Sequence, residues 1–146
     1  MKPHVLSFVP AEDLAIFDRI CQIFRELPEI DLTIAGGRKV KVSCHMVSRA
    51  LAGFFPLTVE DGYFGGLMEH SWLVTENGLI IDPYPCAVVG GPIMVDPRYV
   101  SVPWSSLYQS TKAQLEVTSE PWFQDCVARV RQAVEQTMTE LEIPIR

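Results

Sequence analysis

The chain has 146 residues, of which 48% are hydrophobic, with a formal net charge of −6 and a pI near 5.0. This length suffices for one globular domain with a substantial core, so we expect a single domain over residues 1–146. The excess of acidic over basic residues, and the lack of a basic stripe in the sequence, argue against nucleic acid as a partner. No apolar run approaches the ~20 residues of a membrane span, and the first residues lack the apolar core of a signal peptide. We therefore expect no membrane partner and a cytoplasmic location, with non-classical export left open.

Apolar periodicity predicts helices and strands along the whole chain. The expected elements are a helix over 11–27, a hairpin of 32–34 with 40–42, a helix over 44–53, a strand over 55–64 with a turn at 61–62, a hairpin over 69–82, two short strands around 90–91, a strand fragment over 99–101, and a helix over 121–141 capped by Ser119. Helices combined with antiparallel strands indicate an α+β fold in which the helices pack on an antiparallel sheet.

Cys44 occupies a position that suits a nucleophile. The sequence before it alternates as a strand does, and from Cys44 onward the apolar residues recur at helical spacing up to Gly53. Ser43 is a good N-cap, so Cys44 should lie in the first turn of a helix. The unsatisfied N–H groups and the helix dipole there favour a thiolate over a thiol.

His70 and Asp82 belong to one predicted β-hairpin around Asn77-Gly78. A two-residue loop would place these two side chains on opposite faces of the hairpin. A three-residue loop over 76–78, with Gly78 in the left-handed conformation, pairs residue 75 with 79 and hence 72 with 82. His70 and Asp82 then become diagonal neighbours roughly 5–8 Å apart at Cβ, within reach of a hydrogen bond. We expect the three-residue loop.

Cys44, His70 and Asp82 can therefore supply the nucleophile, the base and the residue that orients the base in a catalytic triad. The backbone N–H of Cys44 would help to stabilise an oxyanion, and a second donor is needed. Gln22 and the indole N–H of Trp72 are the two candidates for that donor.

Other chemistry is less well supported by the sequence. Cys21 and Cys126 fall on apolar helix faces and read as core residues. His45 should point about 100° away from Cys44 on a helix, which argues against it as the base. A zinc site built from Cys44, His45, His70, Asp82 and Cys86 lacks the close ligand spacing of such sites. No metal or other cofactor is expected, and no G-x-S-x-G motif for a serine hydrolase is present.

The residues from Ser43 to Tyr84 resemble the core of transglutaminase-like proteins, a family of the papain-like cysteine protease superfamily. The resemblance lies in a cysteine at a helix start, in His70-Ser71-Trp72-Leu73, and in Ile80-Ile81-Asp82-Pro83. It implies a papain-like α+β core with Cys44, His70 and Asp82 in their catalytic roles, and acyl transfer through a thioester. His70 follows Cys44 by only 26 positions, which favours a small or exposed amide substrate or a partner protein that completes the site.

Two functions thus remain open from the sequence. The first is a cysteine-dependent hydrolase or acyltransferase acting on a peptide, protein or small amide, which predicts a partly exposed Cys44 close to His70. The second is a catalytically inactive scaffold with this fold, which predicts a Cys44 buried or turned away from His70. Such a scaffold would bind a partner protein through an apolar patch, for which Tyr99, Trp104 and Tyr108 are the candidates.

Overall fold

The computed structural model describes residues 9–85, 90–98, 107–111 and 115–145. Its elements confirm an α+β fold. They are α2 (Ala11–Glu26), β1 (Leu32–Thr33), the 3-10 turn η1 (Ala35–Gly37), β2 (Lys39–Val40), α3 (Cys44–Ala52), β3 (Leu57–Phe64), β4 (Met68–Thr75), β5 (Ile80–Asp82), β6 (Ile93–Val95), β7 (Tyr108–Ser110), the 3-10 turn η2 (Glu116–Ser119) and α5 (Pro121–Glu140).

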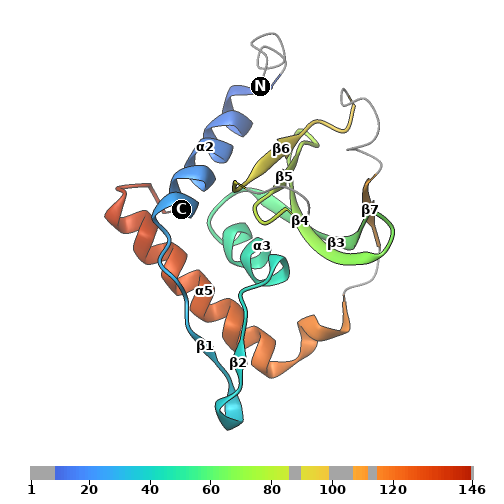
Figure 1. Ribbon diagram of the computed structural model, residues 1–146. Coiled ribbons are helices and arrows are strands. Elements are labelled where there is room, and N and C mark those ends of the chain that lie inside the picture. Colours follow the sequence, from blue (N-terminus) through green and yellow to red (C-terminus); the bar gives the residue numbers. More distant parts are fainter. Residues whose placement is uncertain (1–8, 86–89, 99–106, 112–114, 146) are drawn as a thin grey trace.

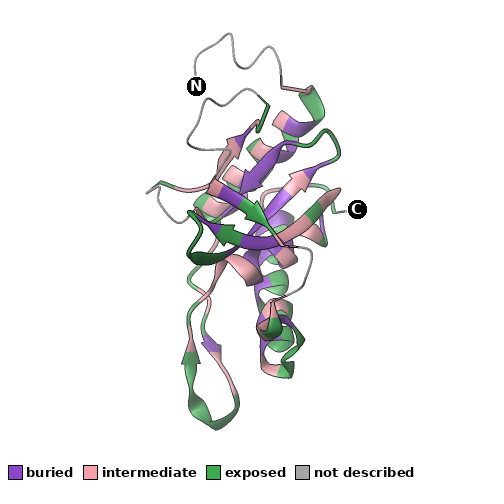
Figure 2. Ribbon diagram, turned by 90° about the vertical axis from the view of Figure 1, so that its right-hand side faces the viewer, coloured by how far each residue is buried: buried purple, intermediate pink, exposed green. Residues whose placement is uncertain are grey.

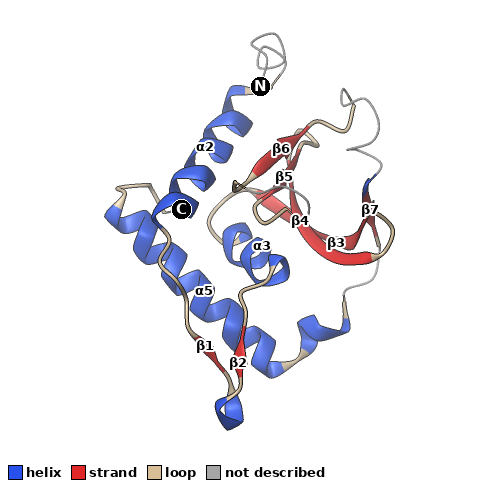
Figure 3. Cartoon of the chain, in the orientation of Figure 1, coloured by secondary structure: helices blue, strands red, loops and turns tan. Residues whose placement is uncertain are grey.

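Five strands form one antiparallel sheet in the order β6-β5-β4-β3-β7. The short helix α3 packs between this sheet and the long helix α5, with β3 and β4 as its neighbours on the sheet side (Figure 1). The separate β1–β2 hairpin extends away from the sheet, and β2 leads directly into α3 (Figure 3). The start of α3 therefore follows the hairpin directly in the chain, and the helix packs against the centre of the sheet.

The two faces of the sheet contribute to two different apolar clusters. Leu73 of β4 and Ile81 of β5 pack with the three helices in the larger cluster. Trp72, which neighbours Leu73 and so points to the opposite face, packs with Phe64 and Tyr108 in the smaller one. Both faces of β4 are consequently buried at its centre (Figure 2). A side chain on either face of β4 is held by packing.

The β4–β5 hairpin has the predicted three-residue loop. Leu73 pairs with Ile81 and Val74 with Ile80, a register that places Trp72 opposite Asp82. Gly78 has φ +84°, in the left-handed region, as a bulged type I loop requires. This register brings His70 and Asp82 to the same face of the sheet.

The expected turn at Asp61-Gly62 is wrong, because both residues lie inside the continuous strand β3 and pair with Ser71 and His70 of β4. The chain reverses instead at Gly65 and Gly66, whose φ angles are positive. Glycine at 62 serves close packing, since a Cβ there would lie 2.0 Å from the carbonyl oxygen of Gln109 in β7. From the sequence alone, a glycine required for the close approach of a neighbouring strand cannot be distinguished from a glycine required for a turn.

The long helices match the prediction closely, apart from one cap. Ser119 lies in η2 and donates its hydroxyl to the carbonyl of Glu116, so it does not cap α5. Glu120 precedes α5 instead, and Pro121 begins the helix. No helix in the described part of the chain has the length and apolar character needed to cross a membrane.

The segment between β5 and η2 was the least well predicted. Strand β6 accounts for the second of the two strands expected around residues 90–91, while residues 86–89 lie outside the described ranges. The strand fragment expected over 99–101 also lies outside them. Strand β7 was not predicted, because three residues are too few for an alternation pattern to stand out.

Candidate active site

Cys44 is the first residue of α3. The Ser43 side chain accepts a hydrogen bond from the backbone N–H of Met46, at 3.4 Å, and caps the helix as expected. The thiol is half-buried, in contrast to the buried thiol of Cys126. The first N–H groups of a helix have no intrahelical acceptor, so a helix start favours a negative charge on the sulfur. Cys44 therefore combines access with a favourable electrostatic position.

His70 and Asp82 form a buried pair. His70 Nε2 lies 2.7 Å from Asp82 Oδ2, and both residues are 0% exposed. The same Oδ2 accepts a hydrogen bond from the Tyr108 hydroxyl at 2.8 Å, and Oδ1 accepts one from the backbone N–H of Tyr84 at 3.1 Å. The same imidazole also interacts with the Cys44 thiol. The carboxylate thus fixes the ring and its tautomer.

Hydrogen bonds at the thiol and at the imidazole favour an ion pair between them. Burial raises the pKa of Cys44, but hydrogen bonds with His45, His70 and the backbone N–H of Ser71 outweigh it and lower the pKa from 9.0 to about 6. Burial lowers the pKa of His70, but the bonds to Asp82 and Cys44 outweigh it and raise the pKa from 6.5 to about 9. Between these values the pair is a thiolate beside an imidazolium.

The other described thiols behave differently. Burial raises the pKa of Cys126, which is a core residue as expected, and also raises that of Cys21. Cys21 is half-buried, so it is less enclosed than a core residue. Cys86 lies outside the described residues. Of the three described thiols, Cys44 has the lowered pKa.

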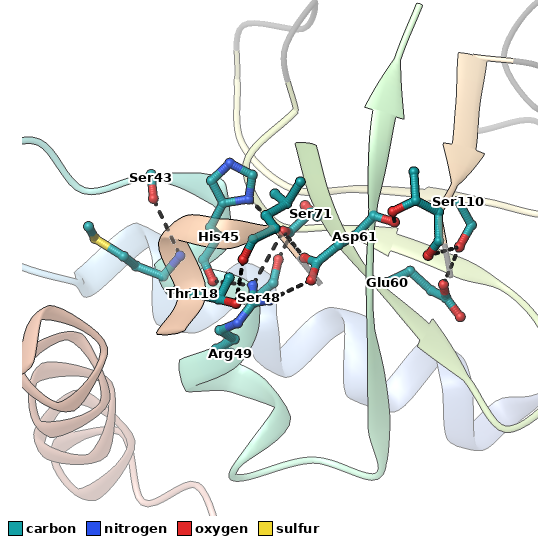
Figure 4. A network of polar contacts seen from close by, with 12 residues as sticks. Ser43, His45, Ser48, Arg49, Glu60, Asp61, Ser71, Ser110 and Thr118 are labelled. Carbon is teal, nitrogen blue, oxygen red and sulfur yellow. Dashed lines mark hydrogen bonds and ion pairs between the residues drawn. The ribbon is translucent and has the colours of Figure 1, made fainter. Parts of the chain in front are cut away.

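A second polar network lies beside Cys44 and was not predicted (Figure 4). His45 Nδ1 lies 2.6 Å from the hydroxyl oxygen of Ser71, which donates to Asp61 Oδ1 at 2.5 Å. Arg49 Nη2 in turn contacts Asp61 Oδ2 at 2.6 Å. His45 also contributes to the lowered pKa of Cys44, although its side chain hydrogen-bonds with Ser71. The sequence signal for this network was Asp61, a charged residue inside an otherwise half-buried strand.

The structure places the two predicted oxyanion donors in different surroundings. Trp72 is buried, and its ring centroid lies 6.0 Å from that of His70. It therefore belongs to the immediate surroundings of the base. Gln22 lies on the exposed side of α2, an element that packs on α5. Proximity to the site favours Trp72 over Gln22.

A cavity of about 950 Å³ extends from the end of α2 to the start of α3. Apolar side chains that include Leu27, Leu32 and Val40 line it, together with four charged residues, Glu29, Asp31, Lys39 and Lys41. At one end it reaches Val42, which lies two residues before Cys44, and Tyr84, whose N–H contacts Asp82. The cavity thus reaches chain neighbours of Cys44 and Asp82, while Cys44, His70 and Asp82 themselves do not line it.

No group of three or more His, Cys, Asp or Glu side chains in the described ranges is arranged to hold a metal ion. The zinc alternative included Cys86, which lies outside those ranges. Comparisons of the chain with protein-family models, with curated proteins and with solved structures find no match. The assignment of a function therefore depends on the chemistry of the site.

Proposed function

We propose that the protein is a cysteine-dependent hydrolase or acyltransferase that cleaves an amide through a thioester, with Cys44 as nucleophile, His70 as acid and base, and Asp82 as the residue that orients His70. The observation that carries the proposal is a half-buried thiol at a capped helix start, hydrogen-bonded to an imidazole that a fully buried carboxylate holds at 2.7 Å. These are the three roles that thiol acyl transfer requires.

In the first half-reaction, the Cys44 thiolate attacks the carbonyl carbon of the amide to give a tetrahedral oxyanion. The backbone N–H of Cys44 stabilises this oxyanion. The C–N bond then breaks, and the His70 imidazolium gives its proton to the leaving amine. The products of this step are a free amine, a thioester on Cys44 and a neutral His70.

In the second half-reaction, neutral His70 takes a proton from water or from a second amine, which attacks the thioester carbon. Collapse of this intermediate breaks the C–S bond and regenerates the thiolate and the imidazolium. Asp82 stabilises the imidazolium in both half-reactions, because its carboxylate accepts a hydrogen bond from the Nε2–H group throughout. Water yields hydrolysis, and an amine yields transfer.

The sequence resemblance supports this proposal. The order of cysteine at a helix start, histidine in one strand and aspartate at the end of the next strand is that of transglutaminase-like proteins, and α3, β4 and β5 carry these residues in that order. A papain-like core is part of the proposal. The cavity that reaches Val42 and Tyr84 would hold the acyl donor.

The inactive-scaffold alternative predicted other features. It expected a Cys44 buried or turned away from His70, and Tyr108 in an exposed apolar patch. Cys44 is half-buried and bonded to His70, whereas Tyr108 is 9% exposed and holds Asp82. Tyr99 and Trp104 lie outside the described residues. The described side chains thus favour the enzyme.

The test is the pH dependence of iodoacetamide labelling at each cysteine, read by peptide mass spectrometry. We expect Cys44 to label with a midpoint near the lowered pKa of about 6, well below the ~8.5 of a free thiol. His70→Gln keeps an N–H donor for Asp82 but cannot form an imidazolium, so it should move the midpoint upward. Cys21 and Cys126 in the same sample are the internal controls.

Labelling reports the ion pair, and turnover reports the function. A library of fluorogenic peptide amides should then show hydrolysis that Cys44→Ser abolishes. If Cys44 labels like a free thiol, or if His70→Gln leaves its midpoint unchanged, the catalytic proposal is wrong.

A further inference from the structure

Ser71 of β4 joins the helix that carries Cys44 to the sheet. The hydroxyl oxygen of Ser71, a fully buried residue, lies 2.6 Å from His45 Nδ1, and its backbone carbonyl accepts a hydrogen bond from the Ser48 hydroxyl at 3.3 Å. His45 directly follows Cys44 on α3. Ser71 directly follows His70 on β4. The chain neighbours of the proposed nucleophile and of its base are therefore in direct contact.

An ion pair between α3 and β3 supports this contact. Arg49 Nη2 lies 2.6 Å from Asp61 Oδ2, and Asp61 Oδ1 accepts a hydrogen bond from the Ser71 hydroxyl at 2.5 Å. Arg49 Nη1 also donates to the backbone carbonyl of His45 at 3.2 Å and to the Ser71 hydroxyl oxygen at 3.4 Å. One guanidinium thus contacts three oxygen atoms, which belong to α3, β3 and β4 (Figure 4).

The sheet and burial hold Asp61 in one place. Asp61 is 8% exposed, and it pairs with Ser71 in the β3–β4 ladder, so the two side chains lie on the same face of the sheet, towards α3. The backbone carbonyl of Asp61 accepts a hydrogen bond from the backbone N–H of Thr111 at 2.8 Å. A buried charge needs its partner, and a planar guanidinium binds in fixed directions. The network consequently has little freedom to rearrange.

Strand β4 is held at two neighbouring residues, from opposite faces. Adjacent side chains of a strand alternate between the faces, so His70 lies on the face where Asp82 contacts its imidazole, and Ser71 lies on the face of α3. The contact with Asp82 fixes the imidazole relative to the sheet, but it does not fix α3. Because hydrophobic packing is non-directional, the directional contacts with Ser71 and Asp61 are needed to set where Cys44 lies.

We propose that the α3–β4 clamp, the network of Arg49, Asp61 and Ser71, positions the nucleophile for the reaction. The clamp holds the start of α3 against β4, so that the thiol of Cys44 stays beside the imidazole of His70. This inference rests on the proposed function and adds positioning residues to it. Reacting atoms must lie about 3–3.5 Å apart, and a misplacement of about 1 Å can slow a reaction about 100-fold. The clamp therefore acts on the rate through the residues that it positions.

Removing both charges of the clamp together separates positioning from folding. Arg49→Met combined with Asp61→Asn leaves no unpaired buried charge, and the new amide keeps an oxygen acceptor for the Ser71 hydroxyl. Replacing a buried ion pair by uncharged side chains of similar volume is often neutral for stability, so the thermal midpoint should stay near that of the wild type. Arg49→Met alone leaves the Asp61 carboxylate without its cation and should lower the thermal midpoint.

The readout is the pH midpoint of iodoacetamide labelling at Cys44, with hydrolysis of the fluorogenic amides as the second measurement. We expect the double variant to raise the labelling midpoint by about one pH unit, because the thiolate loses the stabilisation of about one hydrogen bond. The kcat for amide cleavage should fall about 10–100-fold with little change in KM. Arg49→Lys keeps a cation opposite Asp61, but its ammonium cannot reproduce the guanidinium fork, so it should raise the labelling midpoint as well.

A second ion pair provides the matched control. Arg98 Nη2 lies 3.1 Å from Asp96 Oδ2 after β6, and the Arg98 side chain is 58% exposed. Arg98→Met combined with Asp96→Asn removes the same two charges and leaves the net charge unchanged. This control should keep the labelling midpoint and the kcat of the wild type.

Two outcomes overturn the role of the clamp alone. A folded double variant that labels at the wild-type midpoint shows that the clamp serves stability only, and a wild-type midpoint in Arg49→Lys shows that only the charge at this position matters. If the double variant unfolds, Arg49→Lys decides. A wild-type midpoint near ~8.5 overturns the proposed function together with the clamp. A low midpoint that depends on the clamp, with no amide hydrolysed, supports the positioning of the thiol and counts against the proposed function.

Discussion

At the scale of single residues, Asp82 organises the site. It is fully buried and accepts hydrogen bonds from a ring nitrogen, a hydroxyl and a backbone N–H, supplied by His70, Tyr108 and Tyr84. A buried carboxylate is tolerated when its lone pairs are satisfied in this way. The three bonds leave Asp82 little freedom, so the imidazole that it holds is also fixed.

The ion pair predicts a bell-shaped pH dependence of kcat/KM for amide cleavage. The pKa of Cys44 is lowered to about 6, so activity should rise as pH increases through that value and the thiolate forms. The pKa of His70 is raised to about 9, so activity should fall as pH increases through that value and the imidazolium loses its proton. A rate that keeps rising to pH 10 would contradict the role of His70 as the acid.

Tyr108→Phe tests the support of Asp82. The change removes one donor to a buried carboxylate but leaves the bond from His70, so we expect a loss of about 1–3 kcal/mol in the free energy of unfolding. The Cys44 labelling midpoint should stay low. Urea denaturation measures the first quantity, and Tyr63→Phe, a change at an exposed tyrosine of β3, is the matched control. Equal stability of the two variants would show that the Tyr108 hydroxyl contributes nothing.

At the scale of the elements, the contact between β3 and β7 places Tyr108 over the site. Gly62 pairs with Ser110 and Phe64 with Tyr108 in this ladder. A Cβ at residue 62 would lie 2.0 Å from the Gln109 carbonyl oxygen and 2.9 Å from Ser110 Cα, both of which are backbone atoms. The close approach of the two strands therefore requires glycine at this position.

Gly62→Ala should consequently displace β7 and weaken the bond between Tyr108 and Asp82. We expect a loss of about 2 kcal/mol or more in the free energy of unfolding, because overpacking against backbone cannot be relieved by a rotamer change. Gly53→Ala is the matched control, since its Cβ would meet mainly the flexible Arg131 side chain. Urea denaturation compares the two, and a smaller loss for Gly62→Ala than for Gly53→Ala would refute the explanation.

At the scale of the whole molecule, α2 is attached to the β4–β5 hairpin through one buried carboxylate. Asp13 Oδ2 accepts hydrogen bonds from Thr75 Oγ1 at 3.0 Å and from Asn77 Nδ2 at 3.2 Å. These residues lie at the end of β4 and in the loop that sets the β4–β5 register. The N-terminal helix therefore helps to hold the loop on which the alignment of His70 and Asp82 depends.

Asp13→Ala should lower the free energy of unfolding by about 1–3 kcal/mol, because it leaves the buried Thr75 hydroxyl without this acceptor. Glu12→Ala, which removes an exposed contact with the same Asn77, should change it by less than about 0.5 kcal/mol. Both values can be read from urea denaturation at neutral pH. Similar losses for the two variants would mean that burial of Asp13 is unimportant.

The sequence by itself was sufficient for the features that local patterns encode. The spacing of apolar residues predicted α2, α3 and α5, and the loop around Gly78 predicted the register that aligns His70 with Asp82. The N-cap Ser43 predicted where α3 begins, and hence the position of Cys44. Each of these features depends on residues close together in the chain, so a short window contains the whole signal.

Only the tertiary structure decided the features that depend on distant segments. Tyr108 reaches Asp82 across 26 positions, and His45 reaches Ser71 across the same separation. Gly62 was misread as a turn because its partner, Gln109, lies on a three-residue strand without a pattern of its own. Buried polar groups must find hydrogen-bond partners wherever the fold brings them, and that choice is made by packing between elements.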